Sequence, residues 1–251
     1  MTDYVERNRE SWTRSNEAYT DRRAAEAWAT PEITWGMTGA PEAEVEMLPP
    51  LAGLEIVELG CGTGYFGAWL KRAGAARVLG VDVTPAQLET ARRMNEETAL
   101  GLEFVEANAE DTRLPGESFD LVVSEYGASI WCDPEKWVRE AARLLRPGGE
   151  LVFLRNATLA VLCFTEDSVS ETLQRPQRGL YRLDWDDDGT TEFQMSHSDW
   201  VRTLRENGLE IMALAELYAR EDAQAHEYYT WDPGWAKKWP WEEIWRARKA
   251  A

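Results

Sequence analysis

The sequence feature that most constrains the fold is a buried-strand signal that runs directly into three closely spaced glycines. Residues 57–64 read VELGCGTG, and a helical pattern follows them. Because glycine has no Cβ, such a turn lets the backbone bend sharply and approach a ligand closely. The free N–H groups at the start of the following helix would face that ligand. The stretch therefore predicts a nucleotide-type site at the carboxyl end of a strand.

Strand and helix patterns alternate along the chain on both sides of this turn. Short apolar runs predict strands at 55–59, 77–81, 102–106, 119–124 and 150–155. Between them, apolar residues with helical spacing predict helices, and Thr84, Pro85 and Gln87 form a capping-box start for the helix that runs to Thr98. This alternation is typical of an α/β fold with an open, doubly wound parallel sheet and helices on both faces.

The pattern changes before and after the alternating region. Residues 1–50 predict a helical N-terminal lid, and residues 51–164 the core. Alternating apolar residues within 165–197 predict an inserted hairpin, and 198–251 return to the sheet with a second, aromatic insertion near 219–240. Five tryptophans fall at 231, 235, 239, 241 and 245; they either wall a substrate pocket or attach the C-terminal segment to the body. We expect one domain of 251 residues.

The charge and cysteine content limit the possible partners. The chain carries 27 basic and 45 acidic residues, a net charge of −18, which disfavours nucleic acid and an anionic membrane surface. It shows neither a signal-peptide pattern nor an apolar run long enough to span a bilayer. Three scattered cysteines and two distant histidines predict reduced thiols, a cytoplasmic location and no metal site. We expect a monomer or a homodimer.

Three blocks, in order, resemble the class I S-adenosylmethionine (SAM)-dependent methyltransferases of the small-molecule type. The glycine turn at 57–64 resembles the first motif of the family, and VLGVDVT at 78–84 resembles the strand that ends in its ribose-binding acid. FDLVVS at 119–124 and ARLLRPGG at 142–149 resemble the fourth and fifth motifs. The resemblance covers about residues 50–155, with a weaker likeness at 198–217, and implies a seven-stranded, mostly parallel Rossmann-like sheet.

A dinucleotide site is the competing interpretation, because both folds place an acid about 20 residues after the glycines. The Gly-x-Gly-x-Gly spacing of this turn, and Glu58 ahead of it, favour the methyltransferase motif.

The resemblance implies roles for the residues that match the motifs. The glycines would meet the methionine part of SAM, Asp82 would accept from the ribose hydroxyls, and residues 108–110 would meet the adenine, although Asn108 stands where many relatives have Asp. Glu58 would orient the glycine loop or cap it. The full predicted cofactor site is Glu58, Gly60, Cys61, Gly62, Gly64, Asp82, Val83, Gln87, Asn108, Ala109, Glu110, Ser124, Tyr19 and Trp35.

Some of these residues have two interpretations. Ser124 and Glu125 either lie beside the reactive methyl or hold the methionine ammonium. Tyr19, together with Trp12 and Trp35, would close over the sulfonium or pack in the core.

The catalytic predictions concern Glu125, Tyr126 and His197. A histidine titrates near neutral pH, so His197 is a possible base, as is His226; His197 also precedes a helix start and would serve as a cap there. The resemblance implies methyl transfer from SAM to an O, N or C nucleophile of a small molecule. Non-methylating chemistry on the same fold, or a non-catalytic SAM-binding partner subunit, stay as alternatives.

Overall fold

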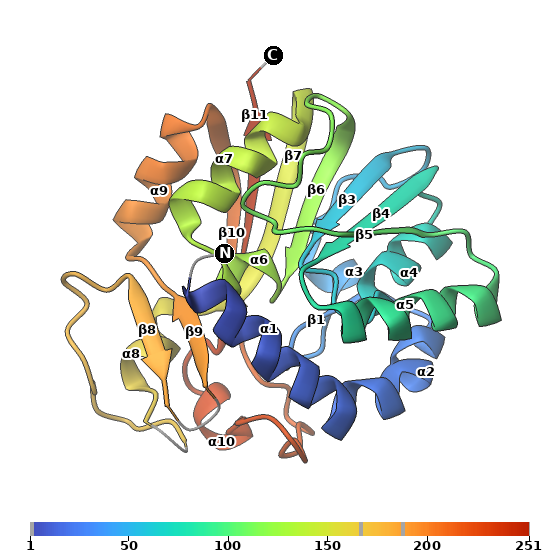
Figure 1. Ribbon diagram of the computed structural model, residues 1–251. Helices are drawn as coiled ribbons and strands as arrows, with labels where there is room; N and C mark the ends of the chain where they lie inside the picture. Colours follow the sequence, from blue (N-terminus) through green and yellow to red (C-terminus); the bar gives the residue numbers. More distant parts are fainter. Residues whose placement is uncertain (1–2, 166–167, 187–188, 251) are drawn as a thin grey trace.

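A seven-stranded sheet runs through the middle of the molecule (Figure 1). The computed structural model describes residues 3–165, 168–186 and 189–250. Neighbouring strands follow the order β10-β11-β7-β6-β3-β4-β5; β11 runs antiparallel to both of its neighbours, and the other pairs are parallel. The strands are β3 (Glu55–Leu59), β4 (Arg77–Asp82), β5 (Glu103–Glu106), β6 (Phe119–Glu125), β7 (Leu145–Asn156), β10 (Leu209–Leu217) and β11 (Glu242–Lys249). The predicted doubly wound, mostly parallel seven-stranded sheet is confirmed.

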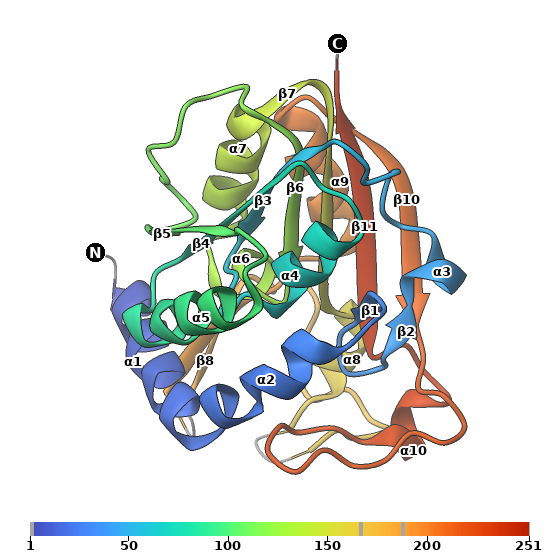
Figure 2. The same cartoon turned by 90° about the vertical axis from the view of Figure 1, so that its right-hand side faces the viewer.

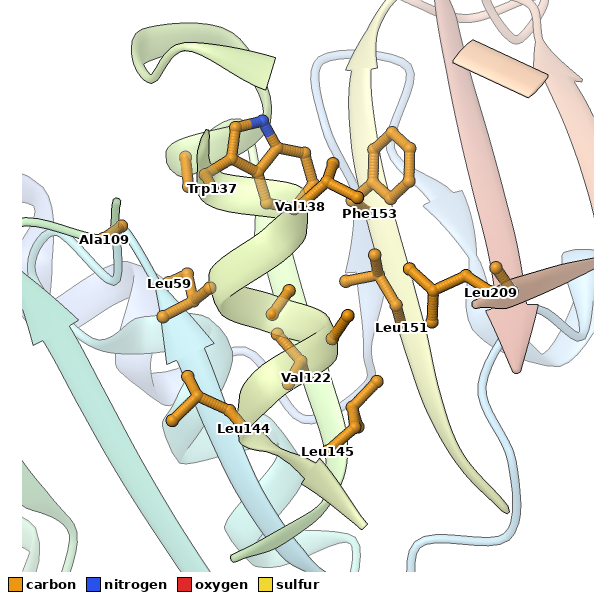
Figure 3. Close-up of a cluster of buried hydrophobic side chains, with 14 of the residues drawn as sticks. Leu59, Ala109, Val122, Trp137, Val138, Leu144, Leu145, Leu151, Phe153 and Leu209 are labelled. Carbon is orange, nitrogen blue, oxygen red and sulfur yellow. The ribbon is translucent and has the colours of Figure 1, made fainter. Parts of the chain in front are cut away.

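Helices cover both faces of this sheet because each presents one apolar stripe to it. On one face lie α7 (Pro134–Leu144) and α9 (His197–Glu206), and Trp137 and Val138 of α7 pack beside Phe153 of β7 (Figure 3). On the other face lie α4 (Tyr65–Arg72) and α5 (Pro85–Thr98), with Phe66 fully buried. The side chains packed between the sheet and the helices on its two faces make up most of the buried core.

The remaining elements gather at one end of the sheet (Figures 1 and 2). The N-terminal segment forms α1 (Asp3–Ser15), a π-helical turn at Asn16–Thr20 and α2 (Asp21–Ala29). A small two-stranded unit, β1 (Thr34–Trp35) and β2 (Ala40–Pro41), precedes α3 (Glu42–Val45). The helix α8 (Thr158–Cys163) follows β7. The first insertion holds the antiparallel pair β8 (Arg182–Trp185) and β9 (Thr190–Phe193), and the second holds α10 (Pro233–Ala236). The hairpin therefore lies within the range expected for it.

One local prediction needs correction. The Thr84 side chain does not cap α5; Asp82 Oδ1 accepts from the Thr84 N–H (2.8 Å), and the Gln87 side chain is turned toward Thr20. Two further local features stabilise the chain near the sheet. Arg146 at the start of β7 pairs with Asp120 (2.7 Å). The Glu42 carboxylate accepts from the Leu48 N–H (2.6 Å) just beyond the end of α3.

No helix in the described part of the chain is long and apolar enough to cross a bilayer.

Candidate functional site

A cavity of about 840 Å³ opens at the edge where the parallel strands end. Loops after β3, β4, β5 and β6 form its floor, as the doubly wound topology requires. The N-terminal helices and both insertions supply its cover. Cavities of this size and position are typical small-molecule sites.

The glycine loop and Asp82 are held together by backbone contacts. Gly60 has φ +79°, and a Cβ there would lie 2.5 Å from Gly127 Cα, so this position requires glycine. Asp82 Oδ2 accepts from the Gly62 N–H (2.8 Å) and Oδ1 from the Thr84 N–H. Asp82 also lines the cavity, where its carboxylate can accept hydrogen bonds from a ligand.

The other predicted cofactor residues divide into those that line the cavity and those that do not. Lining residues are Tyr19, Glu58, Gly60, Cys61, Gly62, Asp82, Val83, Gln87, Asn108 and Ala109. Gly64, Glu110, Ser124 and Trp35 do not line it. Gly64 caps α4 with φ +77°, and Ser124 donates to the Leu59 carbonyl (2.9 Å).

Two of the residues outside the cavity have structural partners that explain their position. Glu110 accepts from the Tyr4 hydroxyl (2.7 Å) and from the Asp133 N–H (2.9 Å), which ties α1 to the start of α7. Trp35 is fully buried against Phe66 and donates to Glu42 (2.6 Å). Glu110 and Trp35 therefore hold elements that border the cavity.

Glu125, at the end of β6, is a buried carboxylate that faces the cavity. Its Oε2 accepts from the Tyr65 hydroxyl (2.5 Å) and its Oε1 from the Gly36 N–H (3.2 Å). Burial, opposed by the hydrogen bond from Tyr65, raises the pKa of Glu125 to about 7. A carboxylate with this pKa exchanges a proton near neutral pH. Tyr65 directly follows the glycine turn, which is the sequence signal that would have identified it.

Tyr126 also lines the cavity, in a left-handed conformation (φ +54°). Its hydroxyl donates to Glu242, at the start of β11. Burial raises the pKa of the Tyr126 phenol well above its usual range. Glu242 also accepts from the N–H of Thr38 (3.1 Å), so the loop after β1 is fastened beside Tyr126.

The two histidines lie in different surroundings. His197 does not line the cavity; its Nε2 lies 2.8 Å from Glu243 Oε2, and that hydrogen bond raises its pKa. His226 lines the cavity, and its Nε2 lies 3.0 Å from the Tyr19 hydroxyl. His226 Nδ1 accepts from the backbone N–H of Tyr228 and Tyr229, so the neutral ring carries its proton on Nε2. Burial lowers the pKa of His226.

Aromatic side chains form much of the cavity cover. Trp12 on α1 makes an edge contact with Trp131 (5.4 Å between ring centroids), and Tyr19 lies 5.5 Å from Tyr229. Of the five C-terminal tryptophans, Trp241 lines the cavity. Trp231 and Trp235 pack edge-on against it, and Trp245 lies in the sheet core, so this cluster mainly attaches the C-terminal segment. The sequence pattern did not identify Trp131 or Tyr229 as cavity residues.

Comparisons with known proteins agree with this geometry. A family model described as a methyltransferase domain matches residues 57–153. A ubiquinone biosynthesis O-methyltransferase from a Methylobacterium strain is 38% identical over 40% of this chain and 40% of its own length. A demethylmenaquinone methyltransferase from Thermus thermophilus is 39% identical over 44% of this chain and 50% of its own length. The chain thus spans half or less of the length of these curated relatives.

A solved structure extends the similarity beyond the core. The crystal structure of an S-adenosylmethionine-dependent methyltransferase from Mesorhizobium loti has a TM-score of 0.68 and 27% identity, covering 85% of this chain and all of that one. The dinucleotide interpretation finds no support in these matches. Together with the strand order, the glycine turn and Asp82, these comparisons show that residues 57–153 match a methyltransferase domain, and that most of the chain is similar in fold to an S-adenosylmethionine-dependent methyltransferase.

Proposed function

We propose that this chain binds SAM in the cavity and transfers its methyl group to an O, N or C nucleophile of a small molecule. The observation that carries the proposal is that Asp82 and the glycine loop hydrogen-bonded to it line the same cavity. About 840 Å³ leaves room for the cofactor and a small acceptor together.

The residues present fit this cofactor. Asp82 would hold the ribose hydroxyls, the loop from Gly60 to Gly64 the methionine part, and Asn108 with Ala109 the adenine. When bound, SAM supplies a methyl group already activated by a positively charged sulfur. The protein therefore has to align the acceptor, exclude water and receive a proton where one is released.

Glu125 is the residue we assign to proton transfer, with Tyr126 orienting the acceptor beside it. Both side chains line the cavity, and Glu125 has a pKa of about 7. His197 pairs with Glu243 and does not line the cavity, so we do not assign proton transfer to it. The N-terminal segment 1–50 would act as the lid, since Trp12 and Tyr19 lie on it and border the same space.

The proposal also concerns the binding partners and the cellular location of the chain. The acceptor would be a small molecule, with neither nucleic acid nor a membrane as partner, and the chain would act as a monomer or homodimer. The three cysteines are unpaired, which supports a reducing, cytoplasmic location. The relatives named for quinone precursors make phenols one class of acceptor to test.

Transfer of radiolabelled methyl from SAM into a metabolite extract would test this function. We expect label in the low-molecular-weight fraction with the parent protein and at least tenfold less with Asp82→Ala. Label found only in RNA or protein would contradict the small-molecule acceptor. Cofactor binding without any label transfer would instead support non-methylating chemistry or a partner-subunit role.

A further inference from the structure

The charged side chains that line the cavity are predominantly acidic. Among the described residues, five carboxylates and one guanidinium line it: Glu26, Glu58, Asp82, Glu125 and Glu192 against Arg23. Arg23 is already paired with Glu26 (2.8 Å) on the partly exposed side of α2. The interior part of the cavity therefore presents carboxylates without a lining cation.

Two of these carboxylates are buried and lack a charged partner. Glu125 is 8% exposed and receives hydrogen bonds from two neutral donors; within the described residues it makes no ion pair. Glu58 is 3% exposed, lines the cavity, and its Oε2 has no hydrogen-bond partner in the described part of the chain. A buried carboxylate in this state is stabilised strongly by a cation or donor that a ligand brings.

Aromatic side chains line the same cavity as these two carboxylates. Tyr229 and Trp12 line the cavity, 6.5 Å apart between ring centroids. Burial raises the pKa of the Tyr229 phenol to about 12. Electron-rich ring faces beside carboxylates are the combination that binds ammonium and methylated ammonium groups.

From these contacts we propose that the acceptor is a basic nitrogen compound, bound as a cation with its ammonium group at Glu125 and its apolar part against the aromatic cover. The inference rests on the proposed function and specifies its substrate class. It differs from the phenolic acceptors for which the quinone-related relatives are named.

The cofactor does not account for all of the negative charge. SAM carries one net positive charge, and Asp82 is assigned to its ribose. Glu125 is left as a carboxylate that lines the cavity and makes no ion pair among the described residues. A phenolate beside Glu125 would be repelled by its charged form, whereas an ammonium would be attracted. Proton transfer from that ammonium to Glu125 breaks one N–H bond, forms one O–H bond and leaves a neutral amine with its lone pair free.

A charge series on one skeleton tests the inference directly. Phenethylamine, 2-phenylethanol and phenylacetate present a cation, a neutral group and an anion at neutral pH. Each is titrated by calorimetry into the parent protein saturated with S-adenosylhomocysteine. We expect the ammonium to bind at least tenfold more tightly than the alcohol, and the carboxylate to bind most weakly. Equal or reversed affinities, or no ammonium binding up to about 10 mM, would overturn the inference.

Variants then assign the effect to a residue. Glu125→Gln should reduce the ammonium-to-alcohol ratio at least fivefold, whereas Glu89→Gln, the same change on the exposed side of α5, should leave it unchanged. If Glu125→Gln weakens only S-adenosylhomocysteine binding and keeps the ratio, Glu125 serves the cofactor and the inference is wrong. A parent protein that does not bind S-adenosylhomocysteine would contradict the proposed function itself, which is a separate outcome.

Discussion

Glu125 is a buried side chain that lies at the end of a strand and lines the cavity of the proposed reaction. It ends β6, at the edge where the ligand loops meet, and its two oxygens are held by Tyr65 and Gly36. Those donors fix the carboxylate, while burial makes its charged form costly. The side chain is therefore positioned to take a proton, at some expense in stability.

That expense leads to a prediction about pH. The folded-state pKa of Glu125 is raised to about 7, whereas the pKa of a glutamate in the unfolded chain has its ordinary value of 4.5. The folded protein keeps the Glu125 carboxyl protonated up to a higher pH than the unfolded chain does. The contribution of Glu125 to the free energy of unfolding is therefore present at acidic pH and is lost as the pH rises to 7. We expect the parent to lose roughly 2 kcal/mol of unfolding free energy relative to Glu125→Gln between pH 5.5 and 8, at about 1.4 kcal/mol per pKa unit.

Urea unfolding of both proteins at several pH values measures this difference. The variant Glu89→Gln removes one exposed carboxylate and should follow the parent at every pH. A constant gap between the parent and Glu125→Gln over the whole range would show that Glu125 does not titrate differently in the folded state.

At the scale of the element, the glycine turn illustrates why position matters more than glycine count. Gly60 and Gly62 both have positive φ, so an L-residue is strained at either one. They differ in surroundings, because a Cβ at Gly60 would lie 2.5 Å from Gly127 Cα, whereas one at Gly62 would lie 3.5 Å from Gln87 Oε1.

The matched pair Gly60→Ala and Gly62→Ala follows from this contrast. We expect Gly62→Ala to cost about 1 kcal/mol of unfolding free energy, from backbone strain alone. Gly60→Ala should cost at least about 3 kcal/mol, since the loop and the segment after β6 must move apart. Equal losses in urea unfolding would show that the close backbone approach at Gly60 does not contribute.

Asn8 connects three elements of the cavity cover. Its amide donates to the carbonyls of Trp131 (3.2 Å) and Thr191 (2.9 Å), and its oxygen accepts from the Thr191 N–H (2.7 Å). Asn8→Ala should therefore leave buried groups unpaired on β9 and loosen the hairpin by about 1–3 kcal/mol. Hydrogen exchange at the Thr191 amide should speed up at least fivefold. Thr13→Ala, which removes a hydroxyl that donates to the Arg9 carbonyl of its own helix, is the control. Unchanged exchange in Asn8→Ala would contradict the linkage.

For the whole molecule, the sheet could be predicted from the sequence more fully than the cavity cover. The strand at 55–59 and the helix at 85–98 have the expected bounds, because their apolar spacing follows directly from burial on one or two faces. The cover depends on contacts between segments far apart in the chain. His226 with Tyr19, and Asn8 with Thr191, are pairs that no local pattern encodes.

The same distinction applies to the site. Asp82 and the glycines follow a strand at a fixed spacing, so their place at the cavity was predictable. Glu125 and Tyr126 also reach the cavity, whereas His197, the first residue of α9, is directed to Glu243. The position of His197 depends on how α9 packs against β11, which is a tertiary contact with no sequence spacing to reveal it.

The central claim is that this cavity binds SAM through Asp82, and calorimetric titration with SAM and with S-adenosylhomocysteine tests it most directly. We expect one site per chain with micromolar affinity for each. Asp82→Ala should weaken both by at least tenfold, because two charge-assisted hydrogen bonds of about 1.5–3 kcal/mol each are removed. Absence of binding by the folded parent protein, or equal affinities for the parent and Asp82→Ala, would contradict the account.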